Sequence, residues 1–139
     1  MHLGYLRNLG APKAKAPPKV RRLAGEDVER WTQQMRKGST RLAILQLVSE
    51  RDRYGYEIVA DIKERTRGVL ALAEGNIYPA LHALEAEGFI TSYWREVEPG
   101  VPPRKYYRLT ARGKELHARL AEEWKEYAAA IGRLLKGGA

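Results

Sequence analysis

The sequence predicts an α+β fold that is mostly helical, and three observations lead to this prediction. Apolar residues recur at helical spacing in four segments between residues 25 and 88. Two segments rich in aromatic and β-branched residues follow, with a Pro- and Gly-rich turn between them, as in a β-hairpin. The last segment, residues 110–135, has apolar residues at nearly heptad spacing and predicts one long helix.

The composition limits the class of protein. A chain of 139 residues is long enough for one domain with appendages. It contains no Cys, which excludes disulfides, thiolate metal sites and a Cys nucleophile. No apolar run approaches the ~20 residues that span a bilayer, and the N-terminus lacks the apolar core of a secretory signal. We therefore expect a cytoplasmic protein.

The net charge of +8 is concentrated at the N-terminus. Residues 1–22 carry six Lys or Arg and no acid, whereas the other 117 residues carry nineteen basic and seventeen acidic side chains. We expect residues 1–24 to form a flexible basic arm. Such an arm can follow DNA phosphates or enter a minor groove, as homeodomain arms do. The alternative is a solvated leader without a role.

The first predicted helix spans Gly25 to Lys37. Val28, Trp31 and Met35 share one face, and the order of acidic residues at the start and basic residues at the end suits the helix dipole. We expect Trp31 to dock this helix onto the domain or onto a partner subunit.

Two further helices follow, with a turn between them. Ser39 or Thr40 is the expected N-cap of a helix over Arg41–Glu50, and the wide apolar face of this helix predicts a place deep in the core. Residues 51–55 are expected to turn the chain. The next helix is predicted over Tyr56–Arg67.

The segment from Asn76 to Gly88 predicts a short helix with two different faces. One face is apolar, and the other carries Asn76, Tyr78 and His82. We expect Asn76 to be the N-cap, Pro79 to lie in the first turn, where its missing N–H costs nothing, and Gly88 to end the helix. A short helix with hydrogen-bonding side chains near its N-terminal end suits the major groove of DNA.

A β-hairpin with basic flanks is predicted after this helix. Its strands are Phe89–Arg95 and Arg104–Leu109, and residues 97–103 form its turn. The order helix, helix, helix, strand, turn, strand is that of a winged helix-turn-helix. We expect residues 25–109 to form a DNA-binding domain of this class, with an extra N-terminal helix. An ordinary α+β core is the alternative.

The long C-terminal helix is predicted over residues 110–135, with Thr110 as N-cap and residues 136–139 as a tail. A helix of roughly 37 Å is too long for so small a core to cover. We expect its apolar seam to meet a second subunit in a two-fold dimer, although part of it can also cover its own domain. The seam consists of Leu116, Leu120, Trp124, Tyr127, Ile131 and Leu134.

Three ordered motifs resemble the PadR family of transcriptional regulators. They are Tyr54-Gly55-Tyr56-Glu57, then Tyr78-Pro79-Ala80-Leu81 with Leu84-Glu85, then Lys105-Tyr106-Tyr107-Arg108-Leu109-Thr110. The resemblance covers about Met35 to Leu135, and the single C-terminal helix is similar to that of the shorter-tailed members. It implies a bacterial, winged-helix, homodimeric repressor that a small molecule or a stress signal releases from DNA. It does not extend to the N-terminal arm or to the helix after it.

The expected functional residues fall into two groups. The resemblance implies that planar aromatic compounds can bind between the C-terminal helices, where Trp124 and Tyr127 would form a flat apolar slot. The alternative is that Trp124 only fills the dimer core. His82 is at the margin of the DNA-binding group and could equally be plain surface. The side chains expected at double-stranded DNA are those of Asn76, Tyr78, Pro79, His82, Arg95, Arg104, Lys105 and Tyr56.

No catalytic, cofactor or metal site is expected, and the protein is not expected to be an enzyme. His2, His82 and His117 lie on separate elements, and none has a metal-binding partner at helical spacing. Two functions remain open. The first is a dimeric repressor that binds an inverted-repeat operator, and the second is a winged-helix module that joins proteins and reads no bases. A module of the second kind would more often expose an apolar patch.

Overall fold

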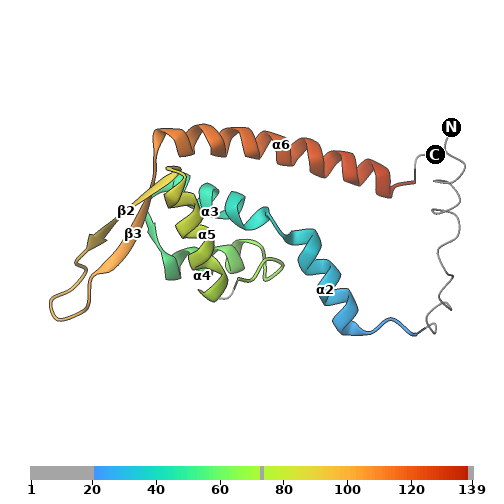
Figure 1. Ribbon diagram of the computed structural model, residues 1–139, viewed down its shortest axis with the longest axis horizontal. Helices are drawn as coiled ribbons and strands as arrows, with labels where there is room; N and C mark the ends of the chain where they lie inside the picture. The colour runs from blue at the N-terminus through green and yellow to red at the C-terminus, as the bar shows by residue number, and fades with distance from the viewer. Residues whose placement is uncertain (1–20, 73, 138–139) are drawn as a thin grey trace, which may run out of the picture. The chain divides into compact units, whose positions relative to one another are not determined.

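The computed structural model describes residues 21–72 and 74–137 and confirms the predicted α+β fold (Figure 1). Its contacts divide the chain into two compact units between Thr32 and Gln33. The predicted basic arm falls mainly on residues 1–20, which lie outside the described part. The elements are α2 (Gly25–Arg36), α3 (Ser39–Glu50), β1 (Arg53–Tyr54), α4 (Gly55–Arg65), α5 (Glu74–Ala86), β2 (Ile90–Arg95), β3 (Arg104–Leu109) and α6 (Ala111–Leu135).

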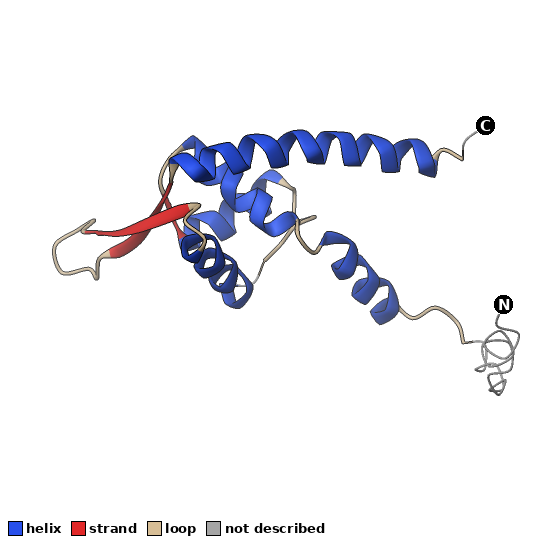
Figure 2. Cartoon of the chain, turned by 45° about the horizontal axis from the view of Figure 1, so that its top comes forward, coloured by secondary structure: helices blue, strands red, loops and turns tan. Residues whose placement is uncertain are grey.

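A single hydrophobic core lies between α3, α4, α5 and the base of the sheet. The apolar face predicted for α5 is confirmed, because Ile77, Leu81 and Leu84 are all buried. The hairpin β2–β3 extends away from these helices, and α6 begins at the base of the hairpin (Figure 2). The buried core consists of Ile44, Leu45, Leu47, Val48, Ile58, Ile62, Ile77, Leu81, Leu84, Ile90, Tyr107 and Leu109.

The sheet has a third strand that the sequence did not reveal. Residues Arg53–Tyr54 were expected in a turn, but they form β1 and pair with β3, so that the strand order is β1-β3-β2 and all pairs are antiparallel. A strand of two residues has no periodicity that could predict it. Its partner β3 lies some fifty residues further along the chain, and only the tertiary fold brings the two together.

Two predicted N-caps are wrong. α3 begins at Ser39 behind Gly38, which has a φ of 98°, and no side chain caps it, so that Ser39 and Thr40 lie inside the helix. The Ser39 hydroxyl instead donates to the carbonyl of Arg36 at 2.7 Å. α5 begins at Glu74, two residues before Asn76, so Asn76 is also inside its helix. In both cases the helix extends N-terminally past the polar residue that was expected to cap it.

The earlier start of α5 also changes the position of Pro79. Pro79 is the sixth residue of the helix rather than a residue of the first turn. It has no N–H to donate to the carbonyl of Gly75, four residues earlier, so one helical hydrogen bond is missing there. The predicted end is confirmed, because Gly88 has a φ of 79° and the next amide, of Phe89, donates to the carbonyl of Leu84 at 2.9 Å.

α6 is capped as predicted. The Thr110 side chain accepts a hydrogen bond from the amide of Gly113 at 3.0 Å, and the Thr110 hydroxyl lies 2.6 Å from the carbonyl oxygen of Gly88. The first half of the helix lies against the core, where Leu116 and Leu120 are partly buried. The second half has no buried residue. Leu116 and Leu120, the first two residues of the predicted seam, therefore cover their own domain, which was the alternative role.

α2 matches the helix predicted over Gly25–Lys37 to within one residue. None of its side chains is buried, and Trp31 is 68% exposed. The contact between Trp31 and a partner subunit stays a prediction.

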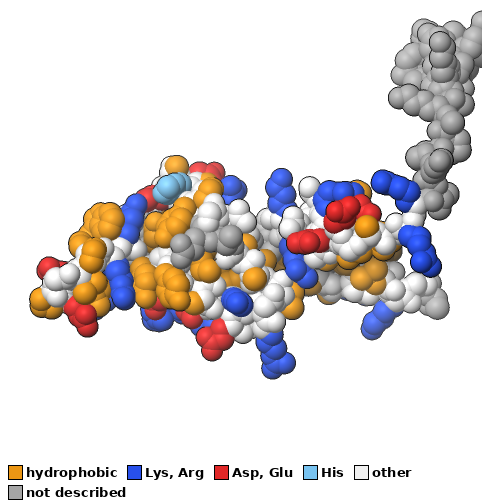
Figure 3. Space-filling view, turned by 90° about the horizontal axis from the view of Figure 1, so that it is seen from below, with side chains coloured by type: hydrophobic (Ala, Val, Ile, Leu, Met, Phe, Trp, Pro, Cys, Tyr) orange, Lys and Arg blue, Asp and Glu red, His pale blue; other side chains and the backbone are white. Residues whose placement is uncertain are grey.

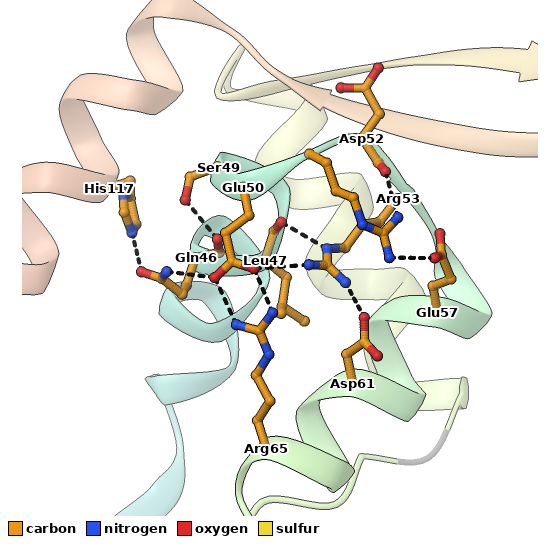
Figure 4. A network of polar contacts seen from close by, with 11 residues as sticks. Gln46, Leu47, Ser49, Glu50, Asp52, Arg53, Glu57, Asp61, Arg65 and His117 are labelled. Carbon is orange, nitrogen blue, oxygen red and sulfur yellow. Dashed lines mark hydrogen bonds and ion pairs between the residues drawn. The ribbon is translucent and has the colours of Figure 1, made fainter.

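A buried arginine joins α3 and α4 (Figure 4). Arg53 is only 3% exposed, and its Nε donates to the carbonyl of Leu47 at 2.8 Å. Its two terminal nitrogens pair with Glu50 of α3, at 2.9 Å, and with Asp61 of α4. Because one guanidinium satisfies groups on both helices, it fixes the position of α4 relative to α3.

Glu50 lies at the centre of this polar network. It also accepts from Arg65 of α4 at 2.7 Å and from the side-chain amide of Gln46 at 3.0 Å, and Gln46 in turn lies 2.7 Å from His117 of α6 (Figure 4). These hydrogen bonds, from Arg65 above all, lower the pKa of Glu50 from 4.5 to about 2. Charged side chains thus link α3 to α4, and the hydrogen bond between Gln46 and His117 extends the network to α6.

We expect the stabilisation from Glu50 to disappear in acid. A carboxylate whose pKa is lower in the folded protein stabilises it above the unfolded pKa of 4.5, and this contribution is lost as the pH falls towards about 2. The difference in denaturation midpoint between wild type and Glu50→Gln should be constant above pH 4.5 and shrink below it. Glu122→Gln, which removes an exposed ion pair with Lys125, should change the midpoint little at any pH. A Glu50→Gln difference that is independent of pH would contradict this assignment.

Candidate nucleic-acid interface

The outer face of α5 carries the side chains that the sequence assigned to base contacts. Asn76, Tyr78, Pro79 and His82 are all exposed, while the opposite face of the same helix fills the core. His82 lies four residues after Tyr78 and three after Pro79, so it shares a face of the helix with each of them. This exposed face presents hydrogen-bonding groups of a type suited to base edges.

Tyr78 lies against the first residue of α4. A Cβ atom on Gly55 would be 3.2 Å from both the ring carbon Cε1 and the hydroxyl oxygen of Tyr78, so only a glycine leaves the ring its full space. The neighbouring Tyr54 and Tyr56 rings are stacked, with centroids 6.4 Å apart, and Tyr56 is 61% exposed. The Tyr54-Gly55-Tyr56 motif therefore brings the start of α4 into contact with the exposed face of α5.

We expect Gly55→Ala to lower the affinity for DNA without unfolding the protein. The new methyl group should displace the Tyr78 ring by a few tenths of an ångström or turn it, and alanine at the first position of α4 is itself favourable for the helix. The control is a double-mutant cycle measured by fluorescence anisotropy on a duplex that the wild type binds. Gly55→Ala should have no further effect in a Tyr78→Ala background. An equal loss in both backgrounds would mean that Gly55 does not act through Tyr78.

The hairpin places the predicted basic residues on two different faces of the sheet. Arg95 and Arg104 are directly opposite each other on β2 and β3 and share one face. Lys105, the next residue on β3, points to the other face, where its Nζ lies 3.9 Å from Glu85 of α5. The structure thus brings two of the three predicted wing residues together and places Lys105 beside α5.

The face of Arg95 and Arg104 is a layer of tyrosines covered by arginines. Arg104 lies over the Tyr54 ring at 4.5 Å, Arg95 over Tyr106 at 5.3 Å and Arg108 over Tyr93 at 5.0 Å. These distances are within the range of cation–π attraction. No role was predicted for these three tyrosines, although the alternation of β3 places residues 104, 106 and 108 on one face.

Arg108 differs from the other two arginines because it has an acidic partner. Asp52 accepts from Arg108 Nε at 3.1 Å and from the Tyr93 hydroxyl at 2.6 Å. These hydrogen bonds raise the pKa of Tyr93 and that of Arg108, so the phenol stays protonated and the guanidinium charged at neutral pH. Asp52 therefore neutralises Arg108, whereas no ion pair among the described residues involves Arg95 or Arg104.

The second half of α6 exposes the seam residues predicted for a partner subunit. Trp124 is 50% exposed and Tyr127 60%, and their ring centroids are 6.2 Å apart. An apolar groove of about 800 Å³ runs between the α6 residues from Leu120 to Leu135 and the segment from Met35 to Leu42. A smaller cavity of about 360 Å³ lies between α3, α4 and α6, with Trp124 at its edge. Trp124 thus borders both hollows, and Tyr127 borders the larger one.

A three-helix core with an exposed polar recognition helix and a β-wing defines a winged-helix DNA-binding protein. A family model described as the transcriptional regulator PadR-like family matches residues 44–119. The chain belongs to this family, which groups DNA-binding regulators rather than enzymes. The family predicted from the three sequence motifs is therefore confirmed.

Individual relatives agree with this assignment. The chain is 38% identical over 94 residues to "Uncharacterized protein X" of Lysinibacillus sphaericus, which covers 68% of this chain and 85% of the relative. It is 37% identical over 78 residues to "Transcriptional regulator YqjI" of Escherichia coli, covering 56% of this chain but only 35% of that longer protein. A crystal structure of a PadR family transcriptional regulator from Eggerthella lenta superposes with a TM-score of 0.68 at 26% identity, covering 81% of this chain and 95% of the other.

Within residues 21–72 and 74–137, none of the helices combines the length and the apolar character that a membrane span requires.

Proposed function

We propose that this transcriptional regulator is a homodimeric repressor that binds an inverted-repeat operator and is released by a small aromatic molecule. The observation that carries the proposal is the exposed polar face of α5, with two arginines on the adjacent hairpin that form no ion pair with any residue the structure describes. In this proposal α5 enters the major groove, and the hairpin contacts the backbone beside it.

The roles of individual residues follow from their places. Asn76 and Tyr78 read base edges, since an Asn side chain can make a bidentate contact with adenine. Pro79 and His82 lie further along the same face and contact the edge of the site. Tyr56 approaches a phosphate from the start of α4. Arg95 and Arg104 bind the backbone from the hairpin, and Lys105 adds positive charge between the hairpin and α5.

The exposed half of α6 supports the dimer. Trp124, Tyr127, Ile131 and Leu134 are large apolar or aromatic side chains on a part of the helix that its own domain does not cover. A two-fold partner would bury them and bring the two Trp124 side chains close together. A planar aromatic ligand between these indoles would change the spacing of the recognition helices and so favour a dimer that fits the operator less well.

A specific observation also supports the second candidate function, a module that joins proteins and reads no bases. The hairpin exposes Trp94 by 68%, Val97 by 44% and Val101 by 39%. This is the kind of apolar surface expected of such a module. The same hairpin carries the arginine pair, and for this reason the repressor is the function we propose.

Selection of bound duplexes from a random pool separates the two functions. We expect the wild type to enrich an inverted repeat with half-site centres ~10 bp apart or a multiple of it. Asn76→Ala should bind the enriched duplex more weakly by ~1–3 kcal/mol, the value of a lost bidentate base contact. Tyr78→Ala should also bind more weakly, and both variants should have unchanged circular dichroism. Glu122→Gln on α6 should bind as the wild type does. A pool without enrichment would overturn the repressor in favour of the interaction module.

A further inference from the structure

The tip of the hairpin is poorly suited to the minor groove. Residues 96–103, between the two strands, include Glu96 and Glu98 but no Lys or Arg. Figure 3 shows hydrophobic and acidic side chains at the left-hand end of the molecule, where the hairpin ends in Figure 1, with Lys and Arg set back from it. The minor groove has a strongly negative potential that attracts cations, so it would repel two carboxylates.

The residues on either side of the tip are positively charged, in contrast to the tip itself. Arg95 and Arg104 form the last pair of the β2–β3 ladder, and like charges directly opposite each other destabilise a sheet. No ion pair among the described residues compensates either guanidinium. Both are instead held on one aromatic surface, because the Tyr54 and Tyr106 rings beneath them are only 5.5 Å apart. A cost of this kind is offset when an anion lies between the two charges.

We propose that this regulator holds a DNA backbone phosphate between Arg95 and Arg104, with Tyr54 and Tyr106 as positioning residues, and that the tip of its hairpin stays out of the minor groove. This inference rests on the proposed function and names the DNA group that the hairpin binds. A planar guanidinium matches the geometry of phosphate oxygens and can donate two parallel hydrogen bonds to them.

The aromatic layer explains why the partner is a phosphate rather than a base edge. A guanidinium whose central carbon lies 4.5 or 5.3 Å from the centre of a ring of its own sheet is not extended away from the sheet. It can meet a phosphate at the surface of the duplex, but the floor of a groove is out of its reach. The ring also restricts the side chain before binding, so less conformational entropy is lost when the phosphate is bound.

The positioning role of Tyr54 can be tested by matched variants. Tyr54 is partly exposed, and Tyr54→Phe keeps the ring whereas Tyr54→Leu removes it. On the duplex enriched by the wild type, Tyr54→Phe should bind as the wild type does, and Tyr54→Leu should bind about two- to fivefold more weakly. Arg104→Ala should reduce the slope of log K against log salt by ~0.9 for one lost phosphate contact. Thermal melts would show that each variant is folded.

The place of the tip can be mapped by cleavage, because the chain has no Cys of its own. A hydroxyl-radical reagent would be attached to Val101→Cys at the tip and, as a control, to Ala86→Cys at the end of α5. We expect the α5 probe to cut the enriched duplex and the tip probe to give no cuts centred across a minor groove.

The outcomes separate this inference from the proposed function. Minor-groove cuts from the tip probe would overturn the inference while leaving the repressor in place. The inference would also be overturned if Arg104→Ala and the wild type had the same slope of log K against log salt. It would be overturned as well if Tyr54→Leu bound the duplex as tightly as Tyr54→Phe. A folded wild type that enriches no duplex would overturn the proposed function and this inference with it.

Discussion

Gly113→Ala should destabilise the domain by about 3 kcal/mol or more, because overpacking against rigid backbone allows little relaxation. A Cβ atom at this position would lie 1.9 Å from the carbonyl oxygen of Phe89 and 2.8 Å from Leu109 Cδ1. The Phe89 carbonyl also accepts from the amide of Thr110 at 3.1 Å, so it is held in place where α6 begins. Denaturant titration followed by circular dichroism would measure the loss.

Gly75→Ala is the matched control for this substitution. Gly75 also lies within a helix, but a Cβ atom there would meet nothing within 4 Å. The same change should therefore leave stability unaltered or raise it by up to about 1 kcal/mol, the difference in helix propensity. If the two variants were equally stable, this result would contradict the close packing of Gly113 against the Phe89 carbonyl.

Ile131→Glu should convert the protein to a monomer and abolish tight operator binding. In the proposed dimer this side chain lies in the buried seam, where an unpaired charge is costly. Losing the second recognition helix removes the advantage of bivalent binding, which amounts to about 100-fold or more in affinity. Sedimentation would report the oligomeric state, and anisotropy on the enriched duplex would report the affinity.

A substitution at Ile131 tests the dimer more specifically than one at Leu120. Leu120 packs against the core of its own domain, so a charge there would also disturb the protomer fold. Ile131 is 37% exposed in the protomer. The control is Ala129→Glu, which adds the same charge nearly half a helical turn away from the seam. A monomeric Ile131→Glu protein that binds the operator with wild-type affinity would contradict the proposed dimer.

Local sequence patterns were sufficient for much of this fold. Helical periodicity located α2 to α6 to within a few residues, and two segments rich in aromatic and β-branched residues with a Pro- and Gly-rich turn between them located the hairpin. Thr110 and Gly88 were identified correctly as helix boundaries, because the signals for both lie within a few residues of the boundary itself. The three family motifs could also be identified from the sequence, because each lies within one continuous segment.

The tertiary structure decided the features that depend on distant residues. β1 exists only because β3 pairs with it, and Arg53 is buried because carboxylates on α3 and α4 surround it. The starts of α3 and α5 were predicted too late, because a polar residue that can cap a helix can equally lie inside its first turns.

The same division applies to the candidate DNA-binding surface. The sequence by itself determined which side chains α5 exposes, because the helical period places them on a different face from the buried Ile77, Leu81 and Leu84. It could not show that Tyr78 rests on Gly55, or that tyrosines from β1 and β3 lie beneath Arg104 and Arg95. Helical and strand periods act over a few residues, whereas packing between elements depends on where the whole chain places them.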